Sequence, residues 1–270
     1  MTTDHAPDLA SALVLEELER DLYRAPNTEA ARTRPALYGG QVCAQALMAA
    51  ALTVPDGRLP HSLHGYFLRP GQVDRPVVLR VDRDRDGRSF SARHVAAVQD
   101  GAVIFSMLAS FQTGTDPAVY ADVVSPDAPV THVPGPDDSP PLGDDALLEL
   151  RQVTMTEVVD GRQFYSDTIW VRTRHPLPDD PVVQACALAY VSDLGTGFGR
   201  IVLPTRGTGG PSIDHGFWFH APVRVDDWLL LELRPWKATS GRGTYQGTIR
   251  DRTGAVAGVI AQEHILHPDG

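Results

Sequence analysis

Residues 64–81 read HGYFLRPGQVDRPVVLRV, and residues 215–233 read HGFWFHAPVRVDDWLLLEL, so one pattern of aromatic, proline and strand-forming residues occurs once in each half of the chain. A second pair follows in the same order, GRSFSARHVAAVQDGAVIF over 87–105 and GRGTYQGTIRDRTGAVAGVI over 241–260. Matches that keep their order over so long a stretch indicate a duplicated unit. The sequence therefore predicts two copies of one fold in a single chain.

Each copy of the unit contains an apolar helix followed by strands. Residues 39–57, GGQVCAQALMAAALTVPDG, are almost wholly apolar up to Pro55, and a helix that is apolar on all sides is buried. Asp100-Gly101 is a strong signal for a hairpin. The second apolar helix, PVVQACALAYVSDL, starts at Pro181. Strands are predicted at 61–68, 76–81, 89–98 and 102–112, and at 164–174, 212–219, 227–233, 244–250 and 255–265.

The two units are expected to be separated by a connecting segment. Residues 113–141 shift to Pro, Asp, Ser and Gly, which is typical of a linker. We expect a first unit over 1–115, a linker over 116–145 and a second unit over 146–270. The spacing of apolar residues over 9–23 also predicts a lead-in helix. The fold class is α+β, with a curved antiparallel sheet around a buried helix in each unit, and pairing the two sheets edge to edge would cover one exposed strand of each.

Composition excludes several functions. The 270 residues carry a net charge of -10, and Lys237 is the only lysine, so no basic stripe is available to bind nucleic acid. No apolar run is long enough to cross a membrane, and residues 1–8 do not resemble a signal peptide. Cys43 and Cys186 lie in apolar stretches without metal-binding spacing, which indicates core residues in a reducing compartment. We expect a cytoplasmic protein.

Six segments together resemble the type II acyl-CoA thioesterases (TesB-like), whose fold is the double hotdog. They are LYGGQVCAQAL (37–47), LHGYFLRPG (63–71), RDGRSFSARHVAAVQDG (85–101), LPDDPVVQACALAYVSDLG (177–195), SIDHGFWFHAPVRVDDWLLLE (212–232) and AQE (261–263). The resemblance implies hydrolysis of acyl-CoA thioesters in fatty acid metabolism, without a metal or an organic cofactor. It also implies that Asp193, Ser212 and Gln262 form the catalytic set. A homodimer or higher homo-oligomer is expected, because hotdog proteins commonly pair further units.

Only the second unit carries this polar set. By the repeat offset Ser212 aligns with His61, Gln262 with Ala109, and Asp193 with the end of the first helix near Leu52. Asp193 lies in the last turn of an apolar helix, where the negative end of the helix dipole disfavours a carboxylate. A broken local rule of this kind often marks a functional residue.

The chemistry expected of the set is activation of a water molecule. Asp193 takes the proton, Ser212 and Gln262 orient the water, and the N–H groups of Gly39 and Gly40 at a helix start are candidates for the oxyanion site. A covalent route through Asp193 is the alternative. Asp214 competes for the role of the carboxylate, although a structural role is the preferred interpretation.

Other functions remain possible from the sequence alone. A protein that binds acyl-CoA without turning it over would keep the groove, and the Gly-rich segment 195–211 allows that alternative. A hotdog hydratase would need an Asp and a His close together, and no convincing version of that motif is present. His61, His64, His215 and His220 suggest a metal site, but residues an odd number of positions apart on a strand face opposite ways, so core or surface histidines are the preferred interpretation.

Overall fold

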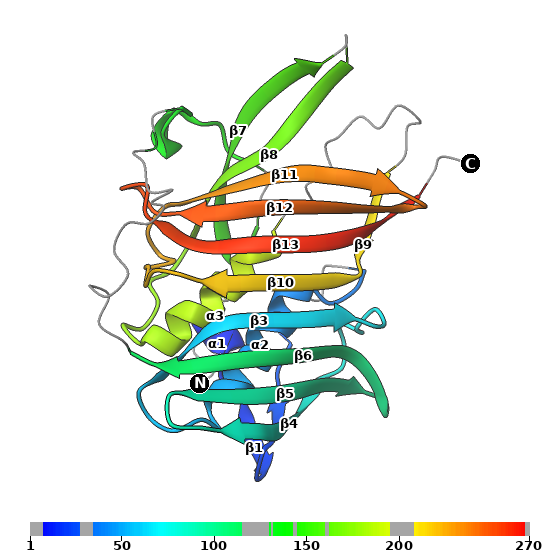
Figure 1. Ribbon diagram of the computed structural model, residues 1–270, viewed down its shortest axis with the longest axis vertical. Coiled ribbons are helices and arrows are strands. Elements are labelled where there is room, and N and C mark those ends of the chain that lie inside the picture. The colour runs from blue at the N-terminus through cyan, green and yellow to red at the C-terminus, as the bar shows by residue number, and fades with distance from the viewer. Residues whose placement is uncertain are drawn as a thin grey trace, which may run out of the picture.

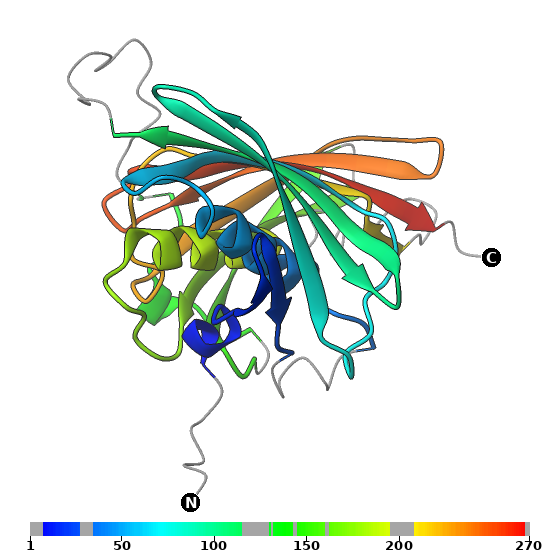
Figure 2. The ribbon, with the colours of Figure 1, turned by 90° about the horizontal axis from the view of Figure 1, so that it is seen from below.

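The protein consists of one large curved sheet with two buried helices on its concave side (Figures 1 and 2). It is a computed structural model in which residues 8–27, 35–114, 130, 132–142, 145–159, 162–194 and 208–267 are described. The first half contributes strands β1 (Glu16–Glu19), β2 (Leu22–Ala25), β3 (Arg58–Phe67), β4 (Val77–Asp86), β5 (Phe90–Gln99) and β6 (Ala102–Thr113). The second half contributes β7 (Leu148–Val159), β8 (Arg162–Thr173), β9 (Thr208–Ser212), β10 (Asp214–Phe219), β11 (Leu229–Thr239), β12 (Arg242–Arg250) and β13 (Val256–His267).

The order of the strands shows that the two halves are built alike. It runs β1-β2-β4-β5-β6-β3-β10-β13-β12-β11-β8-β7, with β9 added beside β13. Strands β3 and β10 meet antiparallel in the middle, and outward from them β6, β5 and β4 on one side match β13, β12 and β11 on the other (Figure 1). Each unit thus covers an edge that the other would expose. This confirms the predicted double hotdog fold, including the edge-to-edge pairing.

Helices α2 (Gly39–Ala51) and α3 (Pro181–Ser192) lie side by side beneath the sheet (Figure 2). Helix α2 buries its side chains from Gly40 through Ala50, as its uninterrupted apolar sequence predicts. Helix α3 begins where Asp180 accepts hydrogen bonds from the N–H groups of Val182 and Val183, with Pro181 in the first turn. None of the described helices is long and apolar enough to cross a membrane.

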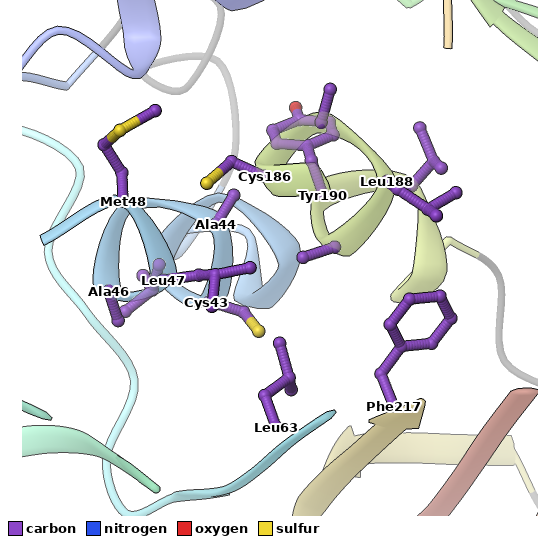
Figure 3. Close-up of a cluster of buried hydrophobic side chains, with 14 of the residues drawn as sticks. Cys43, Ala44, Ala46, Leu47, Met48, Leu63, Cys186, Leu188, Tyr190 and Phe217 are labelled. Atoms are coloured by element: carbon purple, nitrogen blue, oxygen red, sulfur yellow. The ribbon is translucent and has the colours of Figure 1, made fainter. Parts of the chain in front are cut away.

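The core lies where these two helices pack against the central strands (Figure 3). Cys43 and Leu47 of α2 and Cys186 of α3 are there, together with Leu63 of β3 and Phe217 of β10. Both cysteines are free and fully buried, which confirms their interpretation as core residues. Burial raises the pKa of both thiols, so neither is an available thiolate at neutral pH.

The expected lead-in helix over 9–23 is wrong for most of its length. Only α1 (Leu9–Ala12) is helical, and β1 and β2 then form a hairpin whose turn places Asp21 at a φ of 61°. The side chain of Asp21 is held by an ion pair with Arg83 of β4. Strand β2 pairs with β4, so this segment gains sheet hydrogen bonds that an isolated amphipathic helix would lack. Strand β7 was not predicted either.

The described part of the connecting segment covers the outer face of the second unit. Val130 and Val133 pack against the outer side chains Trp170 and Trp228, and the indole N–H of Trp170 donates to the carbonyl of Pro134 at 2.9 Å. A short 3-10 helix, η3 (Pro136–Asp138), follows. This described part of the linker therefore covers apolar residues that point away from the helices.

The two HG dipeptides that introduce the repeat do not occupy equivalent positions. His64 is exposed on the outer face, whereas His215 is buried on the inner face with 1% of its surface exposed. In the first unit, Leu63 of β3 pairs with Ala109 of β6. In the second unit, Gly216 of β10 pairs with Ala261 of β13, which places the adjacent residues His215 and Gln262 opposite each other. The inward position that His215 fills in the second unit is thus filled by Leu63 in the first, one residue away from the simple sequence offset.

Candidate active site

The carboxylate of Asp193 lies at the junction of the two units. Asp193 is the residue that ends α3, and its side chain is 6% exposed. A carboxylate this buried needs donors around it, because an unpaired buried charge costs several kcal/mol. The surrounding side chains supply them from segments far apart in the sequence.

Gln262 of β13 is the direct partner of this carboxylate. Its Nε2 donates to Oδ1 of Asp193 at 2.7 Å, and the hydroxyl of Tyr245 on the neighbouring strand β12 donates to its Oε1. Both side chains are buried. With its oxygen held by Tyr245, the amide has its nitrogen facing Asp193, and the opposite orientation would set a carbonyl oxygen against the carboxylate. The structure thus brings together Asp193 and Gln262, as expected, and adds Tyr245.

The start of α2 lies beside the second oxygen of the same carboxylate. A Cβ placed on Gly39 would come within 2.6 Å of Oδ2 of Asp193 and 2.9 Å of the ring of Phe67, so the missing side chain lets the carboxylate approach the start of α2 closely. A Cβ on Gly40 would instead come within 2.3 Å of the carbonyl oxygen of Tyr190 in α3. Gly39 therefore borders the carboxylate, and Gly40 permits close packing of the helices.

This arrangement explains how a carboxylate is tolerated at the end of α3. The negative end of the α3 dipole disfavours it, but the positive end of α2 lies against it. The first N–H groups of a helix have no partners within that helix, so those of α2 can face an anion. The compensation that the sequence did not reveal comes from the other unit.

Ser212 is near this set but contacts it only through other side chains. Its hydroxyl is 3.3 Å from Nε2 of His264, and the same nitrogen is 3.4 Å from the hydroxyl of Tyr245. A chain of polar contacts thus runs from Ser212 through His264, Tyr245 and Gln262 to Asp193. Burial lowers the pKa of His264, which favours its neutral form at neutral pH.

His215 and Ser192 also lie near the carboxylate. Nδ1 of His215 is 3.9 Å from Oδ1 of Asp193, and its Nε2 is 2.8 Å from the hydroxyl of Ser192. Neither residue was among the expected site residues. The available signal was a histidine at an inward position of an apolar strand. Asp214, the competing carboxylate, accepts the backbone N–H of Glu263 at 2.7 Å, which supports its structural interpretation.

The first unit has no comparable set at the equivalent place. Ala109 stands where the second unit has Gln262, and the residue paired with it is Arg93 instead of Tyr245. Arg93 is fully buried and donates to the carbonyl and hydroxyl of Thr53, just beyond the end of α2. The duplicated fold therefore holds one buried carboxylate site and one arginine-filled counterpart. Within the described part of the chain, no three acidic, histidine or cysteine side chains could hold a metal ion.

The fold and this site define a double hotdog protein with a single buried carboxylate site between its halves. Two family models match the chain, the acyl-CoA thioesterase N-terminal domain over residues 28–112 and the acyl-CoA thioesterase C-terminal domain over residues 126–266. The chain belongs to the acyl-CoA thioesterase family.

Individual relatives agree with this assignment. Acyl-coenzyme A thioesterase 8 of Mus musculus is 34% identical, with 97% of this chain and 91% of the relative covered. Acyl-CoA thioesterase 2 of Haemophilus influenzae is 30% identical, with 98% of each covered. The crystal structure of acyl-CoA thioesterase II TesB2 from Mycobacterium marinum is 37% identical and superposes with a TM-score of 0.79, covering 96% of this chain and 98% of that one.

Proposed function

We propose that this protein hydrolyses acyl-CoA thioesters to a free carboxylic acid and CoA, with Asp193 as the general base. The observation that carries the proposal is that the two oxygens of the Asp193 carboxylate have different surroundings. Gln262 donates to Oδ1, while Oδ2 lies against the start of α2 beside Gly39. We assign the proton from water to Oδ2, because Oδ1 already accepts from Gln262.

The reaction balances with these groups alone. Oδ2 of Asp193 takes one proton from water as the water oxygen bonds to the thioester carbonyl carbon. The negative charge that develops on the carbonyl oxygen faces the N–H groups at the start of α2, with Gly39 the better placed of the two glycines. The tetrahedral intermediate then breaks its carbon–sulfur bond, and the proton held by Asp193 passes to the departing sulfur. Gln262 holds the carboxylate throughout, and Ser212 supports the set through His264.

The setting of this reaction is also proposed. Two reduced, buried cysteines suit the cytoplasm. Tyr66, Trp218 and Trp236 are exposed on the outer face of the sheet, which supports contact with further subunits in a homo-oligomer. We propose acyl groups of fatty acid metabolism as substrates and retain the unit division 1–115, 116–145 and 146–270.

The test is release of CoA from short, medium and long acyl-CoAs by wild type and Asp193→Asn. We expect kcat of the variant to fall by about 10²–10⁴-fold, the range typical of general acid–base catalysis, with a small change in KM. Asp214→Asn is the matched control, since an amide oxygen can still accept the N–H of Glu263, and it should turn over like wild type. If wild type binds acyl-CoA but releases no CoA, the protein is a binding protein and the proposal is wrong.

A single turnover in ¹⁸O-water tests for the covalent route in which water opens the anhydride at the Asp193 carbonyl. Direct attack by water places the label in the acid product on the first turnover. An anhydride opened at the Asp193 carbonyl would place it in the enzyme carboxylate instead, and that result would replace the general-base assignment.

A further inference from the structure

His215 is a buried polar residue that the mechanism above does not use. It lies on the inner face of β10 with 1% of its surface exposed, and its Nδ1 has no hydrogen-bond partner among the described residues. That nitrogen faces Oδ1 of Asp193 at 3.9 Å. Burial lowers the pKa of His215, so the imidazole is neutral at neutral pH and carries one ring proton.

The position of that proton follows from the two neighbours of the ring. Ser192 has one hydroxyl proton and two acceptors within reach, Nε2 of His215 at 2.8 Å and the carbonyl of Ala189 at 2.9 Å. If Nε2 carried the ring proton, the lone pair of Nδ1 would face a buried carboxylate, and the two would repel. If Ser192 donates to Nε2, the ring proton is on Nδ1 and points toward Asp193. The charge on Asp193 favours the second arrangement.

Two donors then converge on one oxygen of the carboxylate. Nε2 of Gln262 donates to Oδ1, and Nδ1 of His215 faces the same atom, while Oδ2 faces Gly39. The 3.9 Å separation is an electrostatic contact, and contacts of this kind commonly shorten when substrate binds. In the first unit the equivalent inward position holds Leu63, and no carboxylate ends α2.

We propose that His215, with its tautomer fixed by Ser192, is a positioning residue that holds Asp193 with Oδ2 directed at the reacting water. The proposal rests on the proposed role of Asp193 as the base. His215 acts through Asp193 and does not exchange protons with substrate. The titratable groups around it are Asp193 at the end of α3, Asp214 on β10 and His64 on β3.

Two amide substitutions separate positioning from packing. The side-chain nitrogen of His215→Asn lies near the place of Nδ1 and can still donate to Asp193, whereas that of His215→Gln lies near the place of Nε2. We expect His215→Asn to keep kcat within about threefold and His215→Gln to lose about 10–100-fold, with little change in KM, because small misplacements of a reacting group have large effects on rate. Ser192→Ala should lower kcat by about 3–10-fold, since it frees the tautomer. His64→Gln, on the outer face, is the matched control and should match wild type.

The pH profile adds a readout that a purely structural role would not move. Losing the donor disfavours the charged carboxylate, so the acidic limb of kcat/KM should move to higher pH in His215→Gln and stay in place in His215→Asn. Equal kcat and equal profiles in the two folded variants would overturn the proposal. If His215→Gln does not fold, a wild-type kcat in Ser192→Ala overturns it instead. Asp193→Asn measured in parallel distinguishes the two ways in which the proposal can fail. An active Asp193→Asn would show that Asp193 is not the base. An inactive Asp193→Asn beside a fully active His215→Gln would contradict only the role of His215.

Discussion

At the scale of single residues, the site depends on which way one amide points. Gln262 can hold Asp193 only with its nitrogen, and the buried hydroxyl of Tyr245 supports that orientation by donating to its oxygen. Tyr245 is also stacked on the ring of His264, which fixes the plane of the phenol. Gln262, which contacts the base, is thus positioned by Tyr245 of the neighbouring strand.

Tyr245→Phe tests this orientation. Without the hydroxyl, Oε1 of Gln262 loses its donor, and the amide is held at its nitrogen alone, so its position beside Asp193 is less well fixed. We expect kcat to fall by about tenfold through misplacement of the base, and the free energy of unfolding to fall by about 1–2 kcal/mol, because a buried acceptor is left unsatisfied. Steady-state kinetics and urea unfolding measure the two effects, with the exposed Tyr66→Phe as control. An unchanged kcat would show that Gln262 needs no help from Tyr245.

At the scale of elements, the contact between the start of α2 and the end of α3 makes the site. The two ends have opposite dipoles, and Asp193 lies between them. Two adjacent glycines serve this contact differently, since Gly39 borders the carboxylate and Gly40 borders the backbone of Tyr190. We therefore expect Gly39 to matter mainly for catalysis and Gly40 mainly for the packing of the two helices.

Alanine at each glycine should separate these requirements. In Gly39→Ala the methyl group would crowd Oδ2 of Asp193, so we expect kcat to fall by at least about tenfold with a small loss of stability. In Gly40→Ala the methyl group would meet a backbone oxygen, so the helices must move apart, at a cost of about 1–3 kcal/mol. Comparing kcat and thermal unfolding of the two variants gives the result. The same loss of stability in both, with the same kcat, would contradict the division.

The elements also show how far the sequence alone can go. Both buried helices and the Asp100-Gly101 hairpin were predictable, because their signals are local, and both turn residues have positive φ. The segment after Ala12 was not, because its pairing with β4 is a long-range contact that helical spacing cannot reveal. In the site, Asp193 and Gln262 came from the family resemblance. Tyr245, Ser192 and His215 lie on three separate elements, and only the folded sheet brings them to one carboxylate.

At the scale of the whole molecule, the two halves keep one topology but use the same place for different purposes. Where the second unit has Tyr245 beside Gln262, the first has Arg93 beside Ala109. Arg93 is fully buried, bonds to Thr53 after the end of α2 and forms an ion pair with Asp86 at 2.7 Å. In the second unit the residue at the end of the helix is the proposed base, Asp193. In the first unit the corresponding helix end is held by a cation, Arg93, which we interpret as a contribution to stability.

Arg93→Met tests that division across the molecule. The substitution fills the space but leaves the carbonyl and the hydroxyl of Thr53 without the donor that Arg93 supplies, so we expect the free energy of unfolding to fall by about 2–4 kcal/mol. Because Arg93 lies in the unit without the carboxylate, kcat measured under conditions where the variant is folded should stay within about twofold of wild type. Arg93→Lys should recover part of the stability, since it keeps the charge without the planar fork. A large loss of kcat in a stable Arg93→Met protein would contradict this division, because it would mean that Arg93 at the far end of α2 also affects the start of α2 beside Asp193.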